Sequence, residues 1–188
     1  SNIKGNLLEA EKLIAQAADD GAELVLLPEN FGIIGAQQAD VIEFREKPGQ
    51  GPLQDFLAQQ ASQHEILIAG GTIPIESKDD GRYRNTLLVY DRAGQCISRY
   101  DKIHLFDVTL PSHDESYQES AVIEPGKQVE VIQLGDVGLV DLELHVHQAE
   151  IGQLDQRAPG VGGGPDLDLV LRVPPAIPTP AVDHDPVL

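Results

Sequence analysis

The sequence predicts an α/β fold, in which helices pack on a layered β-sheet. Residues 6–76 alternate twice between an amphipathic helical pattern and a short apolar run, and a β-hairpin pattern follows at residues 86–100. A chain of 188 residues is long enough to bury a sizeable core. Its 41% hydrophobic content includes four Phe, four Tyr and no Trp, so aliphatic side chains must supply that core.

The first predicted pair is a helix over residues 6–20 and a strand over residues 23–27. Apolar side chains recur in the helix at steps of three and four residues, and Gly21 follows as a C-terminal cap. The strand is continuously apolar, which is typical of a strand buried on both faces, and Pro28 ends it. Glu29 therefore lies at the carboxyl end of a strand.

The second predicted pair is a helix over residues 51–64 and one buried strand over residues 66–75. Pro52 suits the first helical position, where an N–H would have no partner within the helix. Hairpin strands are then predicted at residues 86–90 and 95–100, with Gly94 in the connection and Lys102 just beyond the second strand. A polar loop over residues 109–120 and a hairpin over residues 129–142 complete this part.

Composition changes abruptly after Leu139. Residues 140–188 contain no Phe, Tyr, Lys or Asn, yet carry more than half of the thirteen prolines. Their Gly-rich and Pro-rich stretches cannot propagate a helix or a central strand, and residues 166–173 alone have a strand pattern. We therefore divide the chain into residues 1–139 and a divergent tail, residues 140–188, for which a frameshift and disorder are both hypotheses.

Charge and cysteine content exclude several classes of function. A formal net charge of −18, from 31 acidic and 13 basic side chains, repels phosphates and anionic lipids, so neither nucleic acid nor membrane is an expected partner. No stretch approaches the ~20 apolar residues of a membrane span, and no secretory leader pattern opens the chain. A single cysteine, Cys96, cannot form an intrachain disulfide, which favours a cytoplasmic location.

Three segments carry a family resemblance in a consistent order. Residues 21–31 read Gly-Ala-Glu-Leu-Val-Leu-Leu-Pro-Glu-Asn-Phe, residues 99–108 read Arg-Tyr-Asp-Lys-Ile-His-Leu-Phe-Asp-Val, and residues 117–120 read Tyr-Gln-Glu-Ser. Between the first two, Gly-Gly-Thr-Ile-Pro and Asn-Thr match an intervening strand and hairpin. Over residues 6–139 the chain resembles the nitrilase, or carbon-nitrogen hydrolase, superfamily, and most of all its deaminated glutathione amidase and omega-amidase branch.

The resemblance implies the first part of an α-β-β-α sandwich and an amidase reaction that needs no metal or cofactor. It assigns the general base to Glu29, a catalytic ammonium to Lys102 and an additional active-site carboxylate to Glu119. A thiol is mostly protonated at neutral pH, so a neighbouring carboxylate must take its proton before it attacks an amide carbonyl. The ammonium then stabilises the oxyanion that this attack creates. A small-molecule amide is the implied substrate, and a homodimer is an implied assembly.

Each assignment has a plainer alternative. Outside its motif, Glu29 reads as a solvated loop or cap charge, and Lys102 as a surface lysine after a hairpin. His104 is expected to be a hydrogen-bonded structural side chain rather than an acid or base. His145 and His147 alternate as on one strand face, but no third ligand is placed nearby to form a metal site.

The resemblance breaks at the nucleophile. The family pattern Gly-Leu-x-x-Cys begins at residue 138, and Leu142 stands where the cysteine is expected. A leucine has no nucleophilic atom, and Cys96 lies on the strand before Lys102, where a half-buried structural thiol is expected. Three hypotheses follow: a carbon-nitrogen hydrolase chain that is inactive as written, a non-catalytic remnant that binds a ligand or partner, and an unstable truncated fragment.

Overall fold

Helices and strands alternate through the first half of the chain, as the sequence predicts. The computed structural model describes residues 2–35, 38–79, 81–110, 115–133 and 139–142. The helical elements are α1 (Ile3–Asp19), η1 (Gln38–Phe44), α2 (Pro52–His64) and η2 (Glu119–Ala121). The strands are β1 (Leu24–Leu26), β2 (Leu67–Ala69), β3 (Ile73–Glu76), β4 (Tyr83–Tyr90), β5 (Cys96–Asp101), β6 (Asp107–Leu110), β7 (Glu115–Gln118), β8 (Glu130–Gln133) and β9 (Leu139–Leu142).

Both predicted helices are confirmed, and each has an identifiable start. The Asn2 side chain accepts a hydrogen bond from the N–H of Gly5 at 3.1 Å and so caps α1. At α2, the buried carboxylate of Glu46 accepts the N–H groups of Leu53 at 2.6 Å and Gln54 at 3.2 Å. A negative group at this position satisfies N–H groups that have no partner in the helix and complements the helix dipole. None of the described helices combines the length and apolar character needed to cross a membrane.

A five-stranded mixed sheet forms the centre of the molecule. β1 and β2 pair in parallel, whereas β4 pairs antiparallel with β2, β3 and β5. The predicted single strand over residues 66–75 is wrong, because the chain bends between β2 and β3. Gly71 has a φ of +57°, and a Cβ there would lie 2.0 Å from the carbonyl oxygen of Pro28. The bend thus depends on a glycine that touches the segment leading to Glu29.

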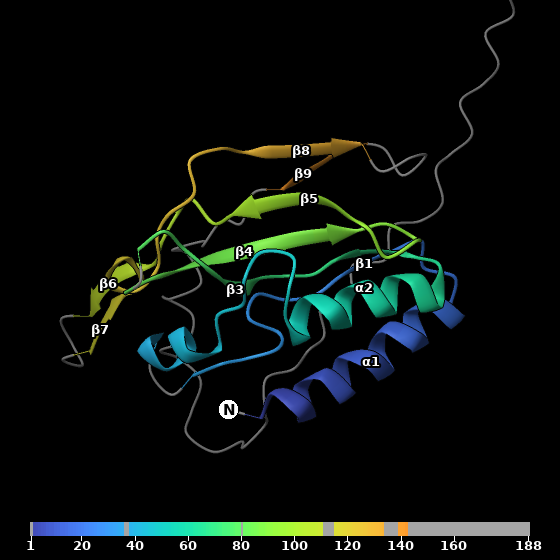
Figure 1. The fold of residues 1–188 in the computed structure, drawn as a ribbon, viewed down its shortest axis with the longest axis horizontal. Helices are drawn as coiled ribbons and strands as arrows, with labels where there is room; N and C mark the ends of the chain where they lie inside the picture. Colours follow the sequence, from blue (N-terminus) through green and yellow to red (C-terminus); the bar gives the residue numbers. More distant parts are fainter. Residues whose placement is uncertain (1, 36–37, 80, 111–114, 134–138, 143–188) are drawn as a thin grey trace, which may run out of the picture.

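The two faces of this sheet are covered differently (Figure 1). One face packs against α1 and α2 and holds the larger apolar cluster, which includes Ile14 and Leu57 from the helices and Val25 and Ile68 from the sheet. A second cluster of buried residues contains no helical side chain and consists of Leu24, Leu67, Ala69, Leu87, Val89 and Tyr100. Ile132 of β8 packs against this second cluster, and β8 and β9 lie on the side of the sheet away from the helices.

The second half of the described chain consists of two small hairpins. The predicted polar loop over residues 109–120 is wrong, since β6 and β7 pair antiparallel with Asp107 opposite Gln118. The predicted hairpin after residue 129 is confirmed by the antiparallel pair of β8 and β9. The strand pattern at residues 166–173 and most of the divergent tail fall outside the described residues, so the division at residue 139 stays a prediction.

Candidate active site

Glu29 lies in a tight turn just beyond β1. The N–H of the next residue, Asn30, donates to the Thr72 hydroxyl at 3.1 Å and to the Thr72 carbonyl at 3.2 Å. Asn30 adopts a left-handed φ of +57°, and Gly71 packs against the carbonyl of Pro28 on the other side. The backbone before and after Glu29 is therefore fixed by the bend between β2 and β3.

Lys102 directly follows β5, and its backbone is held on both sides. Its N–H donates to the carbonyl of Asn85 at 2.9 Å, and its own carbonyl accepts the N–H of Gly126 at 2.9 Å. A Cβ on Gly126 would lie 2.0 Å from the carbonyl oxygen of Asp101, so this approach requires glycine. These contacts fix the direction of the main chain at Lys102, so that its side chain points into the protein.

Glu119 lies in η2 and is held by Phe106, the residue just before β6. Its backbone N–H donates to the Phe106 carbonyl at 3.2 Å, and its Oε2 accepts the N–H of Phe106 at 2.8 Å. This reciprocal pair of hydrogen bonds fixes both the backbone and the carboxylate. Glu119 is consequently a well-anchored charge rather than a mobile one.

These three side chains meet at one place. The Nζ of Lys102 lies 2.8 Å from Oε1 of Glu29, and 3.1 Å and 3.3 Å from Oε2 and Oε1 of Glu119. The Lys102 side chain is 1% exposed, that of Glu119 is 12% exposed, and that of Glu29 is 31% exposed. The cluster is therefore buried at its cation and open at Glu29, where a small molecule can reach the carboxylate.

The electrostatics keep Lys102 charged. Burial alone would lower the pKa of Lys102, but the charge and hydrogen bond of Glu29, followed by those of Glu119, outweigh burial and raise the pKa above its usual value. An ammonium fixed in this way can stabilise negative charge that develops on a bound molecule. Glu29, being a carboxylate with one exposed side, can accept a proton. Together they supply a base and a cation at one point.

Two residues of the site were missed by the sequence analysis as contributors to its chemistry. Asn85 of β4 donates from Nδ2 to Oε1 of Glu29 at 2.6 Å and is 1% exposed. Tyr83 is buried beside the cluster, where burial and then the charges of Glu119 and Glu29 raise the pKa of its hydroxyl. The sequence offered little signal for Asn85, because it stands between the polar residues Arg84 and Thr86, just before the apolar run of β4.

The other residues singled out by sequence are Leu142, His104, Cys96, His145 and His147. Leu142 ends β9, where its backbone pairs opposite Glu130 in a separate two-stranded sheet. His104 is exposed. Cys96, at the start of β5, is an exposed residue, and partial burial of its thiol raises the pKa of that thiol above its usual value. His145 and His147 lie outside the described residues, within which no group of three or more potential ligands could hold a metal ion.

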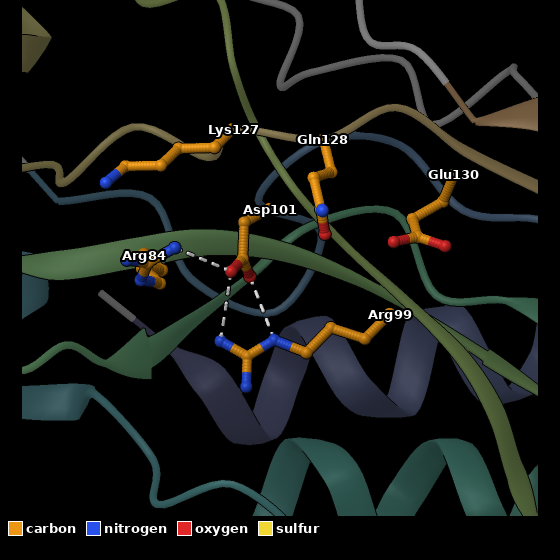
Figure 2. Close-up of a pocket in the computed structure, with 6 residues that line it drawn as sticks. All are labelled: Arg84, Arg99, Asp101, Lys127, Gln128 and Glu130. Atoms are coloured by element: carbon orange, nitrogen blue, oxygen red, sulfur yellow. Dashed lines mark hydrogen bonds and ion pairs between the residues drawn. The ribbon is translucent and has the colours of Figure 1, made fainter.

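A separate ionic cluster stabilises the strand end that precedes Lys102 (Figure 2). Asp101 accepts hydrogen bonds from Arg84 and Arg99, each at 2.9 Å, and from the Thr86 hydroxyl at 2.8 Å. This cluster borders an open cavity of about 500 Å³ to which Lys127, Gln128 and Glu130 also contribute. None of the three residues of the Glu29 cluster lines this cavity. The Asp101 ionic cluster therefore contributes to the site by holding the backbone at position 101.

A family model and similar curated proteins point to the same family for this chain. The sequence matches the family described as carbon-nitrogen hydrolase over residues 1–145. Similar curated proteins include nitrilase homolog 2 of Dictyostelium discoideum, 31% identical over 71% of this chain and 40% of the relative. Deaminated glutathione amidase of Yersinia enterocolitica is 33% identical over 69% of this chain and 45% of the relative. Omega-amidase NIT2 of Homo sapiens is 38% identical over 67% of this chain and 44% of the relative.

Solved structures share the fold. The C. elegans NitFhit protein superposes with a TM-score of 0.57 at 26% identity, covering 68% of this chain and 31% of that chain. Saccharomyces cerevisiae Nit3, of the nitrilase superfamily, has a TM-score of 0.58 at 24% identity, covering 71% of this chain and 46% of that chain. This chain spans less than half the length of the three curated relatives. From the match over residues 1–145 and the shared fold, the chain belongs to the carbon-nitrogen hydrolase family.

Proposed function

We propose that the Glu29 cluster is the acid-base half of an amidase active site, built to hydrolyse a small-molecule amide to an acid and ammonia. The observation that carries this proposal is the buried Lys102 ammonium, 2.8 Å from Glu29 and 3.1 Å from Glu119. The names of the similar amidases support the same reaction class. In this proposal Glu29 is the general base, Lys102 stabilises the oxyanion, and Glu119 holds the lysine and the leaving nitrogen in place.

The proposed chemistry also needs a thiol nucleophile beside the base and the ammonium. Glu29 takes the thiol proton, the thiolate attacks the amide carbon, and Lys102 stabilises the resulting oxyanion. Glu29 then returns the proton to the nitrogen, ammonia leaves, and a thioester remains. Water hydrolyses the thioester, again with Glu29 as base, and the thiol is restored. Each step moves one proton through the same carboxylate.

We propose that this chain, as written, does not complete that reaction. The family pattern expects its cysteine at position 142, where the sequence has leucine, and Cys96 lies on β5 before Lys102. A hydrocarbon side chain cannot form the thioester. The remaining features, including the ω-amide or deaminated-glutathione-like substrate, the homodimer, the cytoplasmic location and the absence of nucleic-acid and membrane partners, are parts of the same proposal.

Ammonia release is the direct test. The purified 188-residue chain, incubated with glutaramate-type ω-amides, is expected to release no ammonia above background. A Lys102→Met variant prepared in parallel is the matched control, because any contaminating amidase would act equally in both samples. Ammonia release by the parent chain that disappears in Lys102→Met would refute the claim of inactivity and support the assigned role of Lys102.

A second candidate function is binding without turnover. It is favoured by the complete ion-pair cluster in a chain whose expected nucleophile is absent. A ligand that binds only the folded state stabilises it by about 2.7 kcal/mol at a concentration 100 times its dissociation constant. Thermal unfolding with and without the ω-amide therefore separates the candidates. Stabilisation without ammonia supports a binding protein, whereas self-association with no stabilisation supports an unstable fragment.

A further inference from the structure

Asn85 contacts both members of the Glu29 and Lys102 pair. Its side-chain Nδ2 donates to Oε1 of Glu29 at 2.6 Å, and its backbone carbonyl accepts the N–H of Lys102 at 2.9 Å. Asn85 is 1% exposed and lies within β4, which pairs with β3 on one side and β5 on the other. A single residue on a central strand thus connects the turn after β1 to the end of β5.

The contacts of Glu29 are distributed unequally between its two oxygens. Oε1 receives both the Asn85 amide at 2.6 Å and the Lys102 ammonium at 2.8 Å. A carboxylate oxygen has two lone-pair sites, so these two donors occupy Oε1 fully. No side chain in the described part of the protein donates to Oε2. The second oxygen is thereby left to exchange a proton.

The orientation of the Asn85 amide is fixed by charge. If the amide were rotated by half a turn, Oδ1 would stand against Oε1 of Glu29 and two acceptors would face each other. In the observed orientation, Oδ1 is buried and has no hydrogen-bond partner within the described residues. A buried carbonyl without a partner loses its bonds to water and gains nothing in exchange. An apolar side chain would avoid that loss, so packing alone does not account for an asparagine here.

We propose that Asn85 is a positioning residue that selects which oxygen of Glu29 exchanges the proton: it binds Oε1 together with Lys102 and leaves Oε2 facing the bound molecule. The catalytic meaning of this role rests on the proposed amidase function. The contact itself does not, because it needs neither turnover nor a bound amide. The side-chain amide of Asn85 accordingly reports on the contact directly.

The test is the side-chain amide signal of Asn85 in proton-nitrogen correlation spectra of the ¹⁵N-labelled full chain. We expect one of its two Nδ2 protons to resonate downfield of the other side-chain amides and to exchange slowly with solvent, because it lies in a short hydrogen bond to a carboxylate. The Asn85→Leu variant assigns the signal by its disappearance. If that variant does not fold, assignment by triple-resonance spectra of the parent chain replaces it.

Two further variants make the test specific. Glu29→Leu removes the acceptor, so the downfield displacement and the slow exchange are both expected to be lost. Thr86→Val is the matched control, since it removes a neighbouring buried hydroxyl that bonds Asp101 at 2.8 Å and leaves Glu29 untouched. An Asn85 signal that is unchanged in Glu29→Leu, or equally changed in Thr86→Val, overturns the proposal. A chain that shows the signal but binds no amide contradicts the proposed function alone.

Discussion

At Lys102 one ammonium serves two carboxylates, and this sharing explains why a lysine can be buried there. A charge moved out of water loses several kcal/mol of solvation unless a partner and hydrogen bonds replace it. Lys102 has both, because Glu29 and Glu119 accept from Nζ while Asn85 and Gly126 hold its backbone. Removing the cation would leave two carboxylates facing the same buried space. The ion pairs of Lys102 with the two carboxylates are therefore a structural feature of the chain as well as a chemical one.

Lys102→Met should destabilise the chain by about 2–3 kcal/mol, below the 3–5 kcal/mol typical of a fully buried pair, because Glu29 is partly solvated. The matched control is Lys12→Met, which removes a solvent-exposed pair with Glu9 and should change stability by less than about 0.5 kcal/mol. Urea unfolding measures both. Equal midpoints for the two variants would show that the buried pair adds no stability.

The same variant has a defined pH dependence. The folded pKa of Lys102 lies above the ordinary value of 10.5, so its stabilising effect is fully present below that value and is lost as the pH rises through the folded pKa. The difference in unfolding free energy between the parent chain and Lys102→Met is therefore constant at neutral pH and shrinks in alkaline solution. A difference that grows with alkaline pH would contradict a raised pKa.

At the scale of elements, the site depends on the bend between β2 and β3. Gly71 approaches the carbonyls of Leu27 and Pro28, and Thr72 binds the N–H of Asn30. These contacts fix the turn that carries Glu29 without using the side chain of Glu29 itself. A change in the bend should therefore disturb the site and the sheet together.

Gly71→Ala is expected to cost about 1–3 kcal/mol, because its Cβ would lie 2.0 Å from a backbone oxygen at a φ of +57°. Gly81→Ala is the matched control: a Cβ at Gly81 would lie 3.4 Å from Oδ1 of Asp79, which is ordinary contact. Urea unfolding of both variants is the measurement. Equal stability of the two alanine variants would rule out the proposed dependence on the bend.

Periodicity predicted α1 and α2 because each has an apolar face, and two strand-like runs joined by a polar loop with Gly94 predicted the hairpin of β4 and β5. It failed where neighbouring backbone decides the structure: the pair Gly70 and Gly71 lies inside an apolar run, and the bend there brings Gly71 against the carbonyls of Leu27 and Pro28. Motif order also predicted that Glu29 and Lys102 meet, although 73 residues separate them. Asn85 was missed as a contributor because its bond to Glu29 joins β4 to the turn after β1, and no local spacing encodes such a contact.

At the scale of the whole molecule, the chain has a compositional boundary close to the expected nucleophile. The family match ends at residue 145. Residues 140–188 contain no Phe, Tyr, Trp or Lys. One event in the coding sequence would account for both the change of composition and the leucine at position 142.

The frameshift hypothesis predicts that another reading frame of the coding DNA, read from the codon after Leu139, encodes a segment similar to Cys-Tyr-Asp-Leu-Arg-Phe. Sequencing the gene and translating the two remaining frames is the measurement. Translating the same frames upstream, over residues 99–108, is the internal control, because only the present frame should carry the lysine motif there. Absence of the cysteine motif from both downstream frames would reject the hypothesis.

The backbone hydrogen bond between Gly126 and Lys102 has a consequence for synthesis on the ribosome. Every donor and acceptor of the cluster belongs to residues 29–126, so a nascent chain that has emerged to this point already contains the complete ionic framework. A codon change downstream, such as one at position 142, therefore changes the residue at the expected nucleophile position and leaves every residue of the cation and carboxylate cluster encoded.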